Sequence, residues 1–232
     1  MRKCGLGQGV WTLLVKGWIV FRKDVQLEFR SRFALNAILM FAVTTLTAVS
    51  FSVGGIRLEA RLLAPFLWIV LFFSAMSGLA HIFVREEEQQ TADTLRLLFP
   101  PNAVWLGKWF FNLVLLFGLE LIIIPLYVVM MDVAIARVDI FLLVLIIGSI
   151  GLASVSTIIA AIISLASSRG ALFAVLAFPI ALPVLLTAIR GSRLALEGTD
   201  FSNCLSVLQV LISFTVIIVT ASLMLFEFVW RK

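Results

Sequence analysis

The sequence predicts an all-α integral membrane protein, built from an N-terminal amphipathic helix at the membrane interface and six transmembrane helices. Hydrophobic residues make up 62% of the 232-residue chain, and its mean hydropathy is +1.14. An ordinary globular domain has about 45–50% apolar residues. Charged residues make up only 13% of the chain and gather in a few segments. The stretches between those segments are long enough to cross a bilayer.

The segment 11–32 is too charged to span a membrane, but it is amphipathic. On a helix, most of its charged residues lie away from one apolar side. That side consists of Trp11, Leu14, Val15, Trp18, Phe21, Val25 and Phe29. We expect an interfacial elbow helix with its aromatic rings at headgroup depth. An ordinary juxtamembrane helix without a mechanical role is the alternative.

Six continuous apolar stretches follow, each with the ~18 or more residues that a transmembrane helix needs. They cover residues 33–53, 62–84, 109–131, 140–165, 170–189 and 206–230. Strands of a membrane barrel would instead show short segments of alternating hydrophobicity. Because the outer loops 54–61, 132–139 and 190–205 are short, we expect residues 1–232 to form a single transmembrane permease domain.

The basic residues predict the orientation of the chain. Most of the 18 lysine and arginine residues lie on the side of the two termini and of the segment 85–108. The exceptions are Arg57, Arg61, Arg137, Arg190 and Arg193. The positive-inside rule then places both termini in the cytoplasm. We expect a multi-pass protein of the bacterial inner membrane, with an organellar inner membrane as the alternative. The basic charge fits anionic lipid and does not indicate nucleic acid, because it flanks spans and lines no groove.

The segment 85–108, which we call the coupling segment, is a polar insert between the second and third spans. It starts with the acidic run Glu86, Glu87 and Glu88. A short helical patch follows, ended by two prolines. The residues of this patch and its end are Thr94, Leu95, Leu97, Leu98, Pro100 and Pro101. A short amphipathic helix outside the bilayer is what a groove on a soluble partner binds. A solvated charged loop is the alternative.

Glu120 is an acidic residue at the middle of the third span. An aspartate at mid-bilayer costs roughly 2.5–3.5 kcal/mol on insertion scales. A hydrogen bond, a proton or a cation must offset a similar cost at Glu120. Pro125 frees a backbone carbonyl nearby. Substrate contact or gating is one interpretation of Glu120, and a protonated carboxyl that joins two helices is the other.

The fourth and fifth spans carry two further patterns. Small residues recur at helical spacing at Ser156, Ala160, Ser164 and Ser168. Such a face lets helix backbones approach closely, either within the subunit or between two copies. In the fifth span, Pro179 and Pro183 predict a kink or a break, because each removes a helix hydrogen bond. A broken helix could line a transport path, whereas a kinked helix could serve helix packing alone.

The sequence contains no catalytic set and no metal-binding pattern. His81 is the only histidine; it is an interface residue or, alternatively, a haem ligand or proton carrier. Cys4 and Cys204 fall on opposite sides of the predicted membrane and cannot pair. The pair GK at 107–108 is followed by Trp109 and lacks the Ser or Thr of a P-loop. We therefore expect no cofactor on this chain and ATP on a partner.

Three segments together resemble a known family. The first is TADTLRLLFPPNAVWLGKWFFNLV, with matching positions Thr94, Leu95, Leu98, Pro101, Gly107, Lys108 and Asn112. The second is ELIIIPLYVV, and the third is GSIGLASVSTIIAAI followed by FPIALPVLLTAI. They resemble the type-2 ABC exporter permeases, and more closely the CcmB family, the haem-exporter permeases of cytochrome c maturation. The sequence FPP departs from the family, which more often has a small residue before a single proline.

The resemblance implies two copies of this permease joined to two copies of a cytoplasmic ABC ATPase subunit. It also implies further haem-handling membrane subunits, a periplasmic haem chaperone, and haem as the cargo. The chain would export haem or use ATP to release the loaded chaperone. Its tryptophans do not form the Trp-rich haem-handling loop of the partner subunits, which favours a mechanical role. The alternatives are a permease for lipid or polysaccharide and a membrane scaffold that transports nothing.

Overall fold

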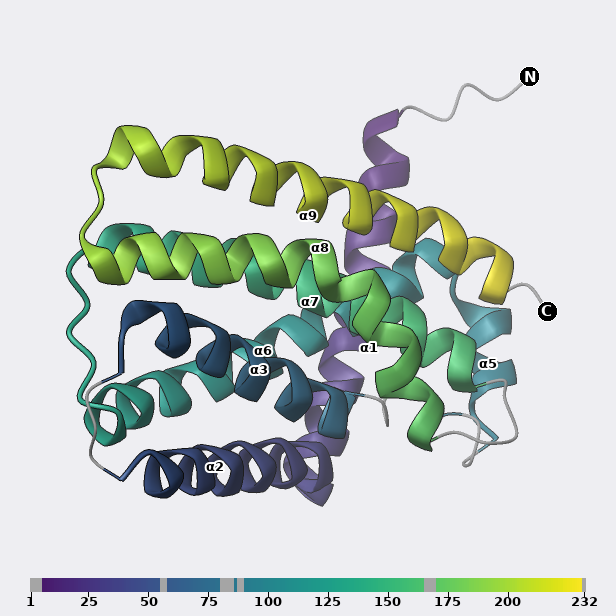
Figure 1. Ribbon diagram of the computed structural model, residues 1–232. Helices are drawn as coiled ribbons and strands as arrows, with labels where there is room; N and C mark the ends of the chain where they lie inside the picture. The colour runs from purple at the N-terminus through teal and green to yellow at the C-terminus, as the bar shows by residue number, and fades with distance from the viewer. Residues whose placement is uncertain (1–5, 55–57, 80–85, 87–89, 165–169, 231–232) are drawn as a thin grey trace.

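The computed structural model describes residues 6–54, 58–79, 86, 90–164 and 170–230. Within these residues the chain forms eight helices and no strand, which confirms the predicted all-α class (Figure 1). The helices are α1 (Leu6–Ser31), α2 (Phe33–Val53), α3 (Ala60–Leu79), α5 (Ala92–Leu98), α6 (Pro101–Met130), α7 (Val138–Ser164), α8 (Gly170–Glu197) and α9 (Phe201–Trp230).

Six of these helices are long and apolar enough to cross a membrane, namely α2, α3, α6, α7, α8 and α9. In Figure 1 they run roughly along one direction, while α1 lies across them near one end of the bundle. The short helix α5 and the C-terminus lie at that same end. This is the arrangement expected of a transmembrane bundle with an interfacial helix.

Helix α7 forms the centre of the bundle because small side chains cover much of its surface. Ser156, Thr157, Ala160 and Ala161 are all buried. The sequence left open whether this small-residue face packs within the subunit or between copies. The described part of the face, which ends at Ser164, packs within the subunit.

Tryptophan–serine hydrogen bonds join the spans across the apolar core. Trp68 Nε1 in α3 donates to Ser192 Oγ in α8 at 2.9 Å. Trp105 Nε1 in α6 donates to Ser222 Oγ in α9 at 2.9 Å, and Trp109 Nε1 donates to Ser154 Oγ in α7 at 2.8 Å. Because a bilayer offers no water to these groups, each pair satisfies an indole that would otherwise be costly to bury.

Three helices extend several residues beyond the spans predicted for them. Helix α6 starts at Pro101 and not at Trp109, because a proline is favoured at the first helical position. The expected outer loop 190–205 is mostly helical, since α8 continues to Glu197 and α9 starts at Phe201. Only Gly198, with φ +75°, is a turn glycine there.

Helix α8 contains both Pro179 and Pro183 and remains helical across them. Figure 1 shows that α8 changes direction along its length. Of the two outcomes that the prolines predicted, the structure has a bend and not a break.

Candidate functional site

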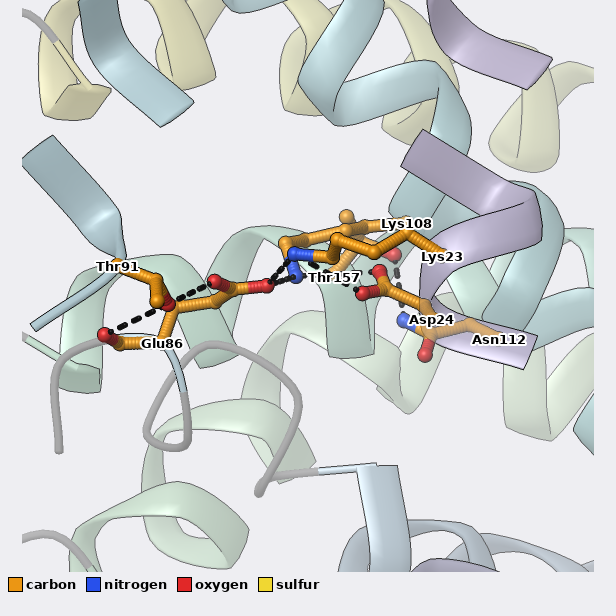
Figure 2. Close-up of polar contacts among 7 residues, drawn as sticks. All are labelled: Lys23, Asp24, Glu86, Thr91, Lys108, Asn112 and Thr157. Carbon is orange, nitrogen blue, oxygen red and sulfur yellow. Dashed lines mark hydrogen bonds and ion pairs between the residues drawn. The ribbon is translucent and has the colours of Figure 1, made fainter. Parts of the chain in front are cut away.

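A buried ion cluster joins α1, Glu86 and α6 (Figure 2). The side chain of Lys108 has no exposed surface, and its Nζ lies 3.2 Å from Asp24 Oδ2 and 3.1 Å from Glu86 Oε1. Lys23 Nζ lies 3.5 Å from Asp24 Oδ1 and also forms an ion pair with Glu86. Two cations therefore face two carboxylates, and the four charges balance. We call Lys23, Asp24, Glu86 and Lys108 the ion cluster.

The cluster forms because α1 crosses α6 at very close range. A Cβ atom on Gly107 would lie 2.7 Å from the Gly17 carbonyl oxygen and 2.7 Å from Val20 Cβ. Real Cβ atoms do not approach so closely, so this crossing requires a glycine at 107. The next residue along α6 is Lys108, and Asp24 lies two turns after Gly17 on α1. The crossing thus brings the two charges together.

One face of the elbow helix packs on the protein, and much of its apolar side faces outwards. Gly17, Val20, Asp24 and Glu28 recur at the three- and four-residue spacing of one helix face, and all are buried. Trp11 and Trp18 on the other side are 69% and 63% exposed. The outward side matches the interfacial helix predicted from the sequence.

The elbow between α1 and α2 is held by a side chain of α1. The Leu35 backbone N–H, in the first turn of α2, donates to Glu28 Oε1 at 2.9 Å. This bond satisfies one of the free N–H groups at the start of a helix. Arg32, at the corner, has a left-handed backbone with φ 53°. The direction of α2 is therefore tied to the face of α1 that carries the cluster.

The charges of the cluster stabilise each other because opposite charges lie close together in a site where only Lys23, with 35% of its side chain exposed, remains in substantial contact with solvent. Burial alone would raise the pKa of Glu86, but the Lys108 ammonium and hydrogen bonds from Lys23 and Thr91 outweigh it and lower that pKa from 4.5 to about 2. Glu86 is therefore ionised near neutral pH. Removing one partner of such a set leaves an uncompensated buried charge, which typically costs about 3–5 kcal/mol.

Glu86 also connects the cluster to α5. Thr91, at the N-terminal end of α5, donates its hydroxyl to Glu86 Oε2 at 2.5 Å. The Thr91 backbone N–H donates to the Glu86 carbonyl at 3.0 Å. A continuous chain of polar contacts thus runs from α5 through Thr91 and Glu86 to Lys108 in α6.

The apolar patch of α5 divides between the inside and the outside of the protein. Leu95 is only 6% exposed, whereas Leu97 is 88% and Leu98 62% exposed. Of the three leucines predicted to dock a partner, only Leu97 and Leu98 are exposed, because Leu95 packs within this chain. The Arg96 guanidinium lies 5.1 Å from the centre of the Trp230 ring, which places α5 against the end of α9.

The other residues predicted to contact the ATPase do not share one surface of the protein. Thr94 is exposed on α5, and Pro101 is the first residue of α6. Glu86 faces inwards to the cluster and not outwards to a partner. Glu87, Glu88 and His81 lie outside the described residues.

Two further contacts tie α6 to α7. Asn112 Nδ2, one turn after Lys108, donates to Thr157 Oγ1 at 2.7 Å. Deeper in the bundle, the Ser149 hydroxyl donates to Glu120 Oε1. Glu120 is buried between the two helices, so its geometry favours the helix-joining interpretation over direct contact with a substrate. Pro125 is exposed on the same helix.

Sequence reasoning missed Lys23 and Asp24 as members of a site. A signal was present, because Asp24 is an acidic residue in a helix that is otherwise rich in lysine and arginine. Its partner Lys108 follows the glycine at which the helices cross, and both belong to the pattern shared with the family. Within the part of the chain that the structure describes, no group of three or more His, Cys, Asp or Glu residues could hold a metal ion.

Comparisons with known proteins show the family of the chain. Among curated proteins, no significant match was found. A family model described as CcmB protein matches residues 15–226, from the elbow helix to the last turns of α9. This match covers most of the chain, including the cluster residues and all six candidate spans. The chain is therefore a multi-pass membrane protein that belongs to the CcmB family, the membrane permease component of haem export in cytochrome c maturation.

Proposed function

We propose that this chain couples ATP hydrolysis by a separate cytoplasmic subunit to movement of its own spans. In this proposal the ATPase binds the exposed side of α5, and the ion cluster passes the displacement to α1 and α6. The observation that carries the proposal is the exposed pair Leu97 and Leu98 on a helix whose first turn is bonded to the cluster.

The contacts support a specific order of steps. A partner that pushes on α5 displaces Thr91, whose hydroxyl and backbone N–H both bond to Glu86. Glu86 pulls on Lys108, because buried charges cannot separate without a large cost. Lys108 is part of α6, and its second partner Asp24 is part of α1. The displacement therefore reaches the elbow helix and the third span together.

The complex that this function requires contains two copies of the chain and two ATPase subunits, which bind the ATP. Further haem-handling membrane subunits and a periplasmic haem chaperone complete it, with haem as the cargo. The chain would lie in the bacterial inner membrane with both termini in the cytoplasm, so that α5 faces the ATPase. Its family membership and the basic residues near α1 support this orientation.

The test is whether the exposed leucines hold the ATPase. We expect Leu97→Asp and Leu98→Asp to reduce co-purification of the ATPase at least about tenfold, since a charge in an apolar docking pocket costs more than the ~1.4 kcal/mol that a factor of ten represents. Membrane insertion should be unchanged, because both side chains are exposed.

The matched controls are Leu97→Met and Leu98→Met, which keep an apolar side chain and should retain the ATPase. Leu95→Asp is not a suitable test, because Leu95 is buried and its replacement would disturb the fold. Wild-type co-purification with both aspartate variants would contradict the proposal.

A further inference from the structure

A groove with a volume of about 560 Å³ lies between the second half of α1, the start of α2 and the middle of α6. This volume is within the range of about 300–1,000 Å³ that is usual for small-molecule sites. Its walls are mostly apolar and include Ile38, Leu39, Phe111, Leu115 and Leu119. The polar lining residues Glu28, Arg32 and Asn36 gather near the corner between α1 and α2.

The groove has the depth of one leaflet. Its polar end lies at the elbow, where α1 exposes Phe29, a lining residue of the groove. Its apolar wall follows α6 inwards to Gly118 and Ile122. Gly118 lies roughly ten residues beyond Lys108, which is ~15 Å along a helix. The hydrocarbon core is ~30 Å thick, so the groove reaches about to mid-bilayer.

The mouth of the groove carries an available positive charge. Arg32 is exposed and has no ion-pair partner among the residues that the structure describes. Its backbone position is fixed, because its N–H donates to the Glu28 carbonyl at 2.6 Å and its own carbonyl accepts from Asn36 at 3.0 Å. The nearby Glu28 carboxylate is bonded to the first turn of α2. An exposed guanidinium on a backbone fixed in this way can bind the oxygens of a phosphate in a bidentate manner.

We propose that this groove is a binding site for an anionic phospholipid of the cytoplasmic leaflet, with one acyl chain along α6 and the phosphate at Arg32. The assignment of the leaflet rests on the orientation proposed above. An apolar channel whose polar end exposes the Arg32 guanidinium matches the shape and charge of such a lipid, because the Glu28 carboxylate at that end is buried and bonded to the α2 backbone. A bound lipid would brace the elbow against α6 next to the ion cluster. Anionic lipids are enriched in that leaflet.

Gly118 permits a test that blocks the groove without disturbing the core. A Cβ atom added at Gly118 meets nothing within 4 Å, so Gly118→Phe should fill the groove and leave the fold intact. Arg32→Gln removes the charge and leaves the channel open. Val129→Phe is the matched control, because Val129 is exposed on α6 and does not line the groove.

The measurement is native mass spectrometry of the purified protein with added phosphatidylglycerol or phosphatidylcholine of identical acyl chains. We expect one retained phosphatidylglycerol, preferred about tenfold or more over phosphatidylcholine. Both lipids carry the phosphate, but the choline cation of phosphatidylcholine cancels its net charge and is repelled by the Arg32 guanidinium. Arg32→Gln should abolish the preference, Gly118→Phe should abolish retention of both lipids, and Val129→Phe should change neither.

Equal retention of the two lipids by the wild type, or unchanged retention in Gly118→Phe, would overturn the proposal. The same spectra report the oligomeric state. If Gly118→Phe dissociates a dimer while lipid retention stays the same, a second copy of this chain occupies the groove and the lipid proposal is wrong. These outcomes do not depend on the ATPase, so they are separable from failure of the proposed function.

Discussion

Lys108 is a fully buried lysine whose charge joins two acidic residues from different parts of the chain. Its ammonium is paired with Asp24 and Glu86, which both precede it in the sequence, by 84 and 22 residues. The residue itself was part of the family pattern, but the sequence did not indicate that it is buried or which acids it meets. Those facts depend on the crossing of α1 and α6, which no local pattern encodes.

Lys108→Met should lower the stability of the protein by about 3–5 kcal/mol, because two buried carboxylates lose a cation. The check is the thermal unfolding temperature in detergent. Lys16→Met is the matched control: Lys16 lies on α1, is half-buried and forms no ion pair within the described residues. If the two variants unfold at the same temperature, the cluster does not stabilise the fold.

Glu120 is the residue for which the sequence left two interpretations open, and its bond from Ser149 favours the one in which it joins two helices. We expect Glu120→Gln to keep normal c-type cytochrome levels on a haem stain, because its amide oxygen can still accept from Ser149. Glu120→Ala should lower stability by about 1–3 kcal/mol, since it removes the acceptor and leaves a cavity. Reduced cytochrome levels in a stable Glu120→Gln protein would instead support a role for the charge in transport.

At the scale of the elements, the sequence predicted the helices well and their ends less well. Six spans were evident from hydropathy, because bilayer thickness sets their minimum length. The outer end of α8 was placed too early, since Arg190 and Arg193 look like loop residues. The helix continues because Arg193 pairs with Glu197 at 2.7 Å, one turn on, and Gly191 packs closely on Val144.

The crossing of α1 and α6 predicts opposite effects for two glycines of one helix. Gly107→Ala should destabilise the protein by about 1–3 kcal/mol, because its methyl group would overlap α1. Gly118→Ala should be neutral or stabilising by up to about 1 kcal/mol, because its methyl group meets open space and alanine favours a helix. Thermal unfolding of both variants checks this, and a Gly107→Ala protein as stable as Gly118→Ala would show that the helices are not in close contact.

At the scale of the whole molecule, α1 and α6 cross towards the end of the bundle at which α5 lies (Figure 1). The ion cluster at this crossing includes Glu86, which is bonded to Thr91 just before α5 (Figure 2). The sequence predicted the coupling segment as the place where a partner binds. It did not reveal the route from that segment into the membrane, because the route is made of tertiary contacts between residues far apart in the chain. The proposed route depends on Thr91, because its side-chain hydroxyl makes the hydrogen bond that joins the start of α5 to the Glu86 carboxylate.

Thr91→Val tests that route most directly. It removes one hydroxyl from a half-buried site, keeps the shape of the side chain and leaves every charge of the cluster paired. A hydrogen bond to a charged group contributes about 1.5–3 kcal/mol. Thr94→Val is the matched control on the same helix, because Thr94 is exposed and forms no hydrogen bond through its side chain within the described residues. The measurement is the level of c-type cytochromes, together with the amount of ATPase that co-purifies. We predict that Thr91→Val retains the ATPase but lowers cytochrome levels several-fold, while Thr94→Val resembles the wild type. Wild-type cytochrome levels in Thr91→Val would contradict the proposed coupling route.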